Sequence, residues 1–324
     1  DGFVGSEGAT YNVTGSRTDV GNSPNAFTYT LNGNTLAANY EITKVEGTLT
    51  VTALTTKVTV TITENSGTVM YDGAEKTVTG YTVAISNPLY KESDFTFSGN
   101  ATVKGTNAGV YNMELIPGNF INNNTNFTNV EFVIVDGMLT ITKRAVTLTS
   151  ATDSKVYDGT ALTNNTVTVT GDGFATGEGA TYDVTGTQTD VGNSPNAFTY
   201  TLNDNTLAAN YEITKVEGTL TVTAITTQIV ITAASDSKKY DGTPLTNAGY
   251  TYTQNVLATG DTLTAVVAGT ITNVGTADNV VTSYKVMRGS TDVTANYTFG
   301  ASVNGALTIT KRAVTLTSAT DSKV

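Results

Sequence analysis

Lysine and asparagine are the residue types in this chain whose side chains could join covalently. Lys155 and Lys238 each lie two residues before a Tyr-Asp-Gly triplet, and Asn210 and Asn296 each precede a tyrosine. A Lys and an Asn held beside a buried carboxylate in an apolar setting would condense to an intramolecular isopeptide bond. Both lysines lie in polar Ser-Lys strings, however, and this favours solvent-exposed lysines over that chemistry.

Carboxylates are the second group of side chains that could hold a ligand, because Ca²⁺ takes oxygen ligands. The best pairs for such a site are Asp190 with Asp204 and Asp236 with Asp241. No Asp-x-Asp/Asn-x-Asp/Asn-Gly loop occurs, and the 28 acidic residues are spread thinly along the chain. We therefore predict a solvated acidic surface and no cofactor, with a calcium site as the alternative.

Tyrosine is the commonest aromatic residue, with 16 Tyr against 10 Phe. Tyr182, Tyr200 and Tyr211 could form an exposed row that stacks on sugars. Tyrosines of a sheet more often pack with the ring half-buried and the hydroxyl hydrogen-bonded. We expect the packed arrangement, and a glycan site is the alternative.

The residue types that are absent exclude most enzymatic mechanisms. The chain has no His and no Cys, so it has no Ser-His-Asp or Cys-His relay, no zinc site of the usual nitrogen and sulfur type and no disulfide. The net charge of −11 argues against nucleic acid or an anionic membrane as a partner, and no apolar run is long enough to insert in a membrane. We predict a protein that is not an enzyme.

Short motifs recur in a fixed order along the chain and identify a tandem repeat. Residues 1–56 align without gaps on residues 172–227 with 48 of 56 positions identical, and residues 139–156 and 307–324 are the same 18-residue string. Four landmarks mark each unit: Tyr-Asp-Gly, Thr-Asp/Asn-x-Gly, Asn followed by an aromatic residue, and Gly-x-Leu-Thr. Together they define a module of about 85 residues.

The predicted modules cover the whole chain, which we expect to be an interval of a longer tandem protein. They are residues 1–53, an incomplete module without its start, then 54–142, 143–224 and 225–310, and finally 311–324, the first strand of a further module. Alternate modules are nearly identical, whereas neighbours share only the landmarks. Pro-, Gly- or Ser-rich linkers do not separate the modules, and we therefore predict short, stiff joints.

Hydrophobic residues alternate with threonine along most of the chain. In residues 57–63, Val58, Val60 and Ile62 alternate with threonines, and threonine accounts for 68 of the 324 residues. A period of two predicts strands with one face on a core and the other in water, and β-branched threonine suits the wet face. We predict an all-β tandem array of small Ig-like β-sandwich modules, joined end to end as an extended rod, with β-grasp-like modules as the alternative.

The Tyr-Asp-Gly and Asn-aromatic motifs are the predicted site residues, and we expect a structural role for both. In the triplet, Tyr would pack on the core, Asp would cap a turn through its own backbone, and Gly would take a positive φ. In the second motif, Asn would cap a turn beside an anchoring ring. The triplets are Tyr71, Asp72 and Gly73; Tyr157, Asp158 and Gly159; and Tyr240, Asp241 and Gly242; the asparagines are Asn39, Asn126, Asn210 and Asn296.

Two ten-residue strings carry a family resemblance: SKVYDGTALT at residues 154–163 and SKKYDGTPLT at residues 237–246. With the NYEI or NYTF and the GTLTVT or GALTIT strings that follow them, they resemble the MBG/YDG-type repeats of large bacterial surface proteins. The resemblance covers the entire chain and implies a secreted, adhesin-like polypeptide at the bacterial cell surface or cell wall. Residues 54–142 depart from the pattern, because Val69 and Met70 replace the Ser-Lys pair.

We therefore expect stalk or spacer repeats of a bacterial surface adhesin or fibre, which project a distal binding domain from the cell. One alternative is a set of repeats that bind mucin or host glycans weakly and gain avidity from their number. The other is an extracellular filament that assembles by strand addition between copies, because residues 311–324 match the segment that residues 1–53 lack. Neighbouring repeats of the same chain are the partners expected in every case.

Overall fold

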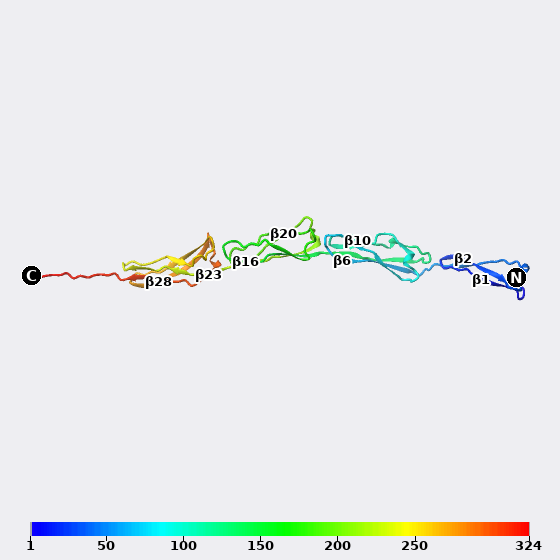
Figure 1. The fold of residues 1–324 in the computed structure, drawn as a ribbon, viewed down its shortest axis with the longest axis horizontal. Helices are drawn as coiled ribbons and strands as arrows, with labels where there is room; N and C mark the ends of the chain where they lie inside the picture. The colour runs from blue at the N-terminus through cyan, green and yellow to red at the C-terminus, as the bar shows by residue number, and fades with distance from the viewer. Residues whose placement is uncertain (1, 324) are drawn as a thin grey trace. The chain divides into compact units, whose positions relative to one another are not determined.

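The computed structural model describes residues 2–323, and these residues form an all-β protein, which confirms the predicted class (Figure 1). The helical segments of this part of the chain are single 3₁₀ turns: η1 (Ala37–Asn39), η2 (Glu92–Asp94), η3 (Pro117–Asn119), η4 (Ala208–Asn210) and η5 (Thr294–Asn296). Among residues 2–323, no helix has the length and apolar character needed to cross a membrane. The chain divides into two compact units, Asp1–Lys143 and Arg144–Val324.

The first unit contains strands β1 to β14. They are β1 (Ala9–Val13), β2 (Gly21–Asn25), β3 (Phe27–Leu31), β4 (Gly47–Val51), β5 (Val58–Glu64), β6 (Gly67–Met70), β7 (Lys76–Thr79), β8 (Tyr81–Ile85), β9 (Phe95–Phe97), β10 (Thr102–Gly105), β11 (Gly109–Asn112), β12 (Phe120–Asn122), β13 (Val130–Val135) and β14 (Met138–Thr142). Residues 1–53 form the two-stranded ladders β1-β3 and β2-β4. Residues 54–142 form two three-stranded sheets, β8-β5-β13 and β6-β14-β11, beside the pairs β7-β10 and β9-β12.

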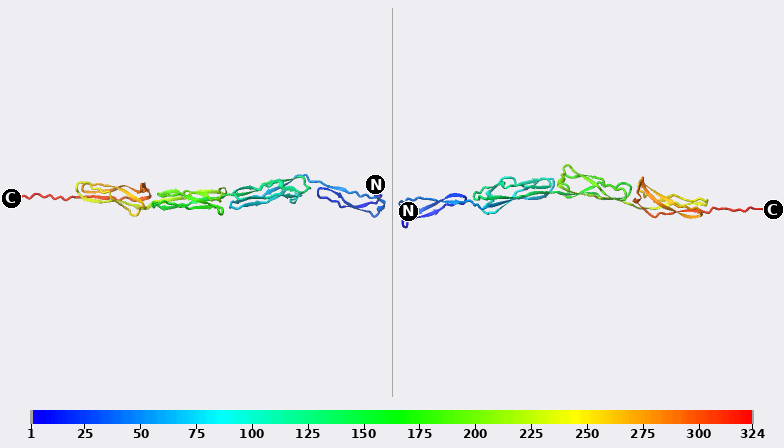
Figure 2. Two further views of the ribbon diagram at one scale, coloured as in Figure 1. Left: turned by 90° about the horizontal axis from the view of Figure 1, so that it is seen from above. Right: turned by 180° about the vertical axis from the view of Figure 1, so that it is seen from behind.

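The second unit contains strands β15 to β31. They are β15 (Arg144–Ser150), β16 (Asp153–Val156), β17 (Val167–Gly171), β18 (Ala180–Val184), β19 (Gly192–Pro195), β20 (Phe198–Leu202), β21 (Tyr211–Val216), β22 (Thr219–Thr223), β23 (Ile225–Ile229), β24 (Ile231–Ala233), β25 (Asp236–Lys239), β26 (Tyr250–Tyr252), β27 (Asp261–Ala268), β28 (Gly275–Arg288), β29 (Thr291–Asp292), β30 (Tyr297–Phe299) and β31 (Gly305–Thr310). Residues 311–323, which follow β31, form no strand (Figure 2).

The first two strands of a complete module pair in parallel with its last strands. In residues 143–224, β15 lies between β17 and β21, antiparallel to β17 and parallel to β21, while β16 runs parallel to β22. Residues 54–142 repeat this order with β5 parallel to β13 and β6 parallel to β14. Hydrophobic alternation defines the faces of a strand but not its neighbours, so the sequence did not predict this pairing.

The central strands carry the cores of their modules. Val58, Val60 and Ile62 on β5 are fully buried, and so are Val146 and Leu148 on β15. The intervening threonines are half-buried or exposed. A strand with neighbours on both sides loses its edges as well as one face to the protein interior, which explains the full burial of these five side chains.

Candidate functional site

Some of the motif residues lie where one module meets the next within a unit: Asn126 in the first unit, and Tyr157, Gly159 and Asn296 in the second. In the second unit a single residue, Ala224, separates β22 from β23, so the modules 143–224 and 225–310 meet without a linker. One cluster of buried side chains spans this joint, because it contains Leu220 and Val222 from the first of these modules together with buried residues of the second. The apolar core is therefore continuous from one module into the next.

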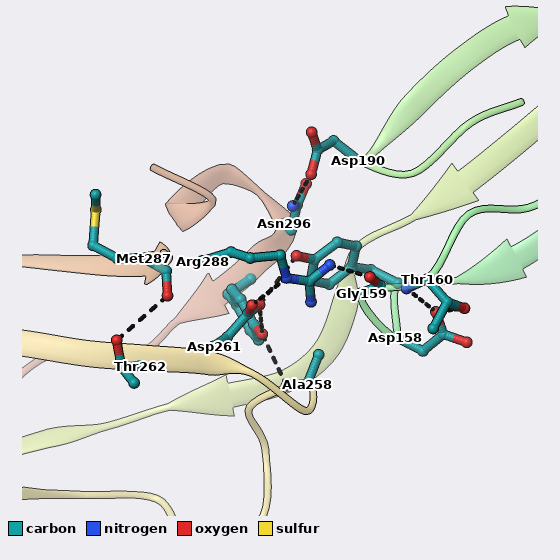
Figure 3. A network of polar contacts seen from close by, with 12 residues as sticks. Asp158, Gly159, Thr160, Asp190, Ala258, Asp261, Thr262, Met287, Arg288 and Asn296 are labelled. Carbon is teal, nitrogen blue, oxygen red and sulfur yellow. Dashed lines mark hydrogen bonds and ion pairs between the residues drawn. The ribbon is translucent and has the colours of Figure 1, made fainter. Parts of the chain in front are cut away.

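Asn296 connects the two modules through both ends of its side-chain amide. Its Nδ2 donates to Oδ1 of Asp190 over 2.8 Å (Figure 3), and its Oδ1 accepts the backbone N–H of Val191 over 2.8 Å. Asn296 ends η5, and its residue surface is only 3% exposed. Asp190 and Val191 belong to the Thr-Asp-x-Gly landmark, so this contact, here called the asparagine clasp, joins two of the four repeated motifs.

The first unit contains the same clasp at its own joint. Asn126 donates from Nδ2 to Oδ1 of Asp19 over 2.9 Å and accepts the N–H of Val20 over 2.7 Å. An isolated parallel bridge between Leu54 and Phe127 lies beside it. Two joints that are built from different neighbouring modules thus use the same donor, the same acceptor and nearly the same distances.

A buried carboxylate forms a second contact across the joint of the second unit. The Asp261 side chain has no exposed surface, and it accepts hydrogen bonds from Tyr297 Oη over 2.6 Å and from Tyr157 Oη over 3.0 Å. Arg288 Nε pairs with its other oxygen over 2.7 Å. Asp261 and Arg288 face each other across β27 and β28, whereas Tyr157 belongs to the preceding module. These four residues are called the carboxylate network.

Burial keeps the hydroxyls of Tyr157 and Tyr297, which donate to the Asp261 carboxylate, in the protonated state. A buried ionised carboxylate is costly unless it is paired and hydrogen-bonded. Burial raises the pKa of Tyr297, and the hydrogen bond to Asp261 raises it further. Burial likewise raises the pKa of Tyr157. Both hydroxyls therefore remain protonated donors at neutral pH, and the Arg288 guanidinium supplies the compensating charge.

The triplet Tyr157-Asp158-Gly159 forms the edge of this network (Figure 3). Asp158 Oδ1 accepts the N–H of Thr160 over 2.8 Å and so caps the turn. Gly159 has a φ of 82°, and its carbonyl accepts a hydrogen bond from Arg288 Nη1. The positive φ favours glycine at position 159, and a Cβ there would displace the Arg288 guanidinium from its place in the network.

The other two triplets share the turn but not the surroundings of the tyrosine. Asp72 caps the N–H of Ala74 over 2.9 Å, and Asp241 caps the N–H of Thr243 over 3.0 Å; Gly73 and Gly242 have φ values of 87° and 82°. Tyr71 is buried, whereas Tyr240 is 40% exposed. The prediction that the triplet tyrosine packs on the core is therefore wrong at Tyr240, because residues 311–323 form no module that would cover it.

The prediction that the motif asparagines cap their own turns is also wrong at Asn126 and Asn296. At Asn126 and Asn296 the side chain reaches the preceding module. Asn210 is fully buried, whereas Asn39 is exposed and makes no side-chain hydrogen bond to any residue of the range 2–323. The Asn-aromatic and Thr-Asp/Asn-x-Gly landmarks recur in every module, and this recurrence was the sequence signal that could have indicated a contact between neighbouring modules.

The other candidate residues are the lysines of the possible isopeptide bonds and the aspartates of the possible calcium site. Lys155 pairs with Asp158 over 2.8 Å and Lys238 with Asp241 over 3.0 Å, so both lysines lie on triplet aspartates rather than on an asparagine. Asp190 belongs to the clasp. The part of the chain that the structure describes contains no group of three or more carboxylates that could hold a metal ion.

The three tyrosines of the alternative sugar-binding row are partly or fully covered by other residues. Tyr182 and Tyr200 lie opposite each other on β18 and β20 and are half-buried. Tyr211 is buried, and its hydroxyl donates to Glu178 over 2.7 Å. These rings pack as the sequence predicted for a sheet surface.

The polar groups of the joint bond to one another. The Asn296 amide is shared between Asp190 and Val191, and the Asp261 carboxylate is shared among its tyrosine and arginine donors. Groups paired in this way hold two surfaces together.

A scan against models of known protein families gives no match to this chain, and a search of curated proteins gives none either.

Proposed function

We propose that this chain consists of stalk or spacer repeats of a bacterial surface adhesin or fibre. In this proposal small Ig-like β modules are joined end to end and project a distal binding domain from the cell. The observation that carries the proposal is the asparagine clasp, which recurs at the joint within each unit, between Asn126 and Asp19 and between Asn296 and Asp190.

A spacer must resist bending between its modules, and the joints have features that serve this purpose. Two modules connected only by one strand can hinge about that connection. The clasp adds a second point of attachment, and in the second unit the shared apolar cluster and the carboxylate network add further ones. Several separated contacts restrain both the bending and the twisting of one module against the next.

The surface composition also suits an extended extracellular chain. The net charge of −11 and the threonine-covered strand faces keep the modules soluble and discourage side-to-side association. The motif resemblance to MBG/YDG-type repeats supports a location at the bacterial cell surface or cell wall, with neighbouring repeats as the main partners.

Small-angle X-ray scattering of the chain at low concentration, with and without EDTA, tests this proposal. β5 and β6 follow each other over residues 58–70, which at about 3.3 Å per residue makes a module roughly 40 Å long, so four modules in line would extend to about 160 Å. We expect a maximum dimension near that value that EDTA does not change. A compact particle would contradict the stalk, and binding to mucin that strengthens with module number would favour the glycan-binding alternative.

A further inference from the structure

The first two and the last two strands of module 143–224 run side by side in one register. Arg144 on β15 lies opposite Tyr211 on β21, and Val156 on β16 lies opposite Thr223 on β22. The offset between partners is 67 residues at both ends, from 144 to 211 and from 156 to 223, and at every paired position between them. These four strands therefore form one continuous parallel pairing, here called the terminal ladder.

Module 54–142 contains the same ladder. β5 pairs with β13 from Val58 opposite Val130, and β6 pairs with β14 as far as Met70 opposite Thr142. The offset is 72 residues at both ends, from 58 to 130 and from 70 to 142, and it does not change between them. Two neighbouring modules that share only the landmarks in sequence thus keep an unbroken register between their first and last strands.

The parallel direction of this ladder determines how a module responds to a force along the chain. The chain enters module 143–224 at the start of β15 and leaves it at the end of β22, and these points are opposite ends of the ladder. Tension at the two points pulls the first and the last strands in opposite directions along their own axes. The hydrogen bonds run between the strands rather than along them, so all of them are strained together.

The buried side chains of the ladder resist the same sliding motion. Four of them alternate with threonines along β15 and β22 and are at most 1% exposed: Val146, Leu148, Leu220 and Val222. A slip of one residue would turn these side chains to the solvent and bring the threonines to the core. Residues 157–210, which connect the two sides of the ladder, carry no tension while the ladder holds.

Module 225–310 has the corresponding strands, but its ladder is interrupted. Ile225 on β23 lies opposite Tyr297 on β30, an offset of 72 residues. Ile229 lies opposite Phe299, an offset of 70, so the register shifts within β23. The regular part of this ladder is the pairing of β25 with β31. Fewer hydrogen bonds are therefore strained together when this module is pulled by its ends.

We propose that the terminal ladder is a mechanical clamp, which keeps modules 54–142 and 143–224 folded under a force that pulls along the chain. Module 225–310, with the interrupted ladder, unfolds at a lower force. The inference deepens the proposed stalk function and rests on it for the origin of the force, because a stalk is pulled along its length when its distal domain is held. The two proposals can fail separately, because scattering tests the extended shape and pulling tests the resistance of a single module.

Single-molecule pulling of the 324-residue chain between two introduced cysteines tests the clamp, since the chain has no Cys of its own. In K143C/T223C the two exposed attachment points lie at opposite ends of the terminal ladder, so the force shears it. The matched variant K143C/A209C has exposed attachment points before β15 and before β21, at the same end, so the force peels the strands apart one pair at a time. The folded module is the same in both variants, and we expect a severalfold higher unfolding force in K143C/T223C. Equal forces in the two directions would overturn the proposal.

A third attachment pair compares the two kinds of ladder. T223C/K311C applies the shearing direction to module 225–310, because its attachment points precede β23 and follow β31. Each sheared module should release roughly 250–280 Å of chain, at about 3.6 Å per residue less the folded length, which identifies its unfolding event. We expect a lower unfolding force for T223C/K311C than for K143C/T223C, because the register shifts in β23. A force as high as that of K143C/T223C would overturn the assignment of the resistance to an unbroken ladder.

Discussion

The clasp between Asn296 and Asp190 allows a charge-swap experiment with a sharp expectation. In N296D one carboxylate oxygen still accepts the Val191 N–H, but the other replaces the amide that now donates to Asp190 over 2.8 Å. The change removes a hydrogen bond to a charged group, which contributes about 1.5–3 kcal/mol. It also places two carboxylates in contact, although solvent around Asp190 screens that repulsion. We expect a loss of about 2–4 kcal/mol in the free energy of unfolding.

The reverse swap isolates the pairwise contact. D190N alone keeps a neutral hydrogen bond and should cost about 1 kcal/mol. The double variant D190N/N296D restores an amide donor opposite a carboxylate and should recover most of the stability that N296D loses. Urea unfolding followed by circular dichroism measures all four members of the cycle. N39D is the matched control, because Asn39 has the same motif but is exposed; a loss in N296D no greater than in N39D, or no recovery in the double variant, would refute the reasoning.

Three further predictions concern the triplets and the carboxylate network. G159A should destabilise the chain more than G242A, because both glycines have a φ of 82° but only at Gly159 would an added methyl overlap a neighbouring side chain; thermal unfolding of the two variants measures the difference. D261N should cost about 2–4 kcal/mol in urea unfolding, because it removes the buried charge that accepts from two tyrosines and pairs with the half-buried Arg288 guanidinium, and a loss below 1 kcal/mol would contradict that role. In a carboxyl NMR titration Asp241 should titrate near pH 2, because the Thr243 N–H and then Lys238 lower its pKa to about 2. K238M should remove only part of this shift. The stability that Asp241 contributes should be lost as the pH falls from the ordinary pKa of an aspartate toward 2.

The sequence predicted the fold class and the buried faces because both depend on local pattern. Alternation in residues 57–63 identified β5 and the side of it that is buried, and the turn signals placed the capped aspartates of the triplets. The order of strands depended on contacts between distant residues. β15 and β21, for example, pair in parallel although they lie at opposite ends of a module, and no periodicity within either strand indicates its neighbour.

The sequence singled out several residues of the candidate site but did not predict which of them are in contact. The landmarks singled out Asn296 and Asp190 as repeated residues, yet their bond joins positions 106 residues apart. The motif asparagines were expected to act locally because Asn side chains commonly hydrogen-bond their own backbone in turns. Asp261 and Arg288 lie outside the landmarks, and only the pairing of β27 with β28 brings them together.

Distance measurement between two spin labels tests most directly whether a joint holds its modules at a fixed angle. The chain has no Cys, so labels on T181C in β18 and T264C in β27, both at exposed positions of adjacent modules, are specific. We expect one narrow distance distribution in the otherwise unsubstituted chain and a clearly broader one when N296A removes the clasp. A broad distribution before that substitution, or one that N296A leaves unchanged, would contradict a rigid joint made by Asn296.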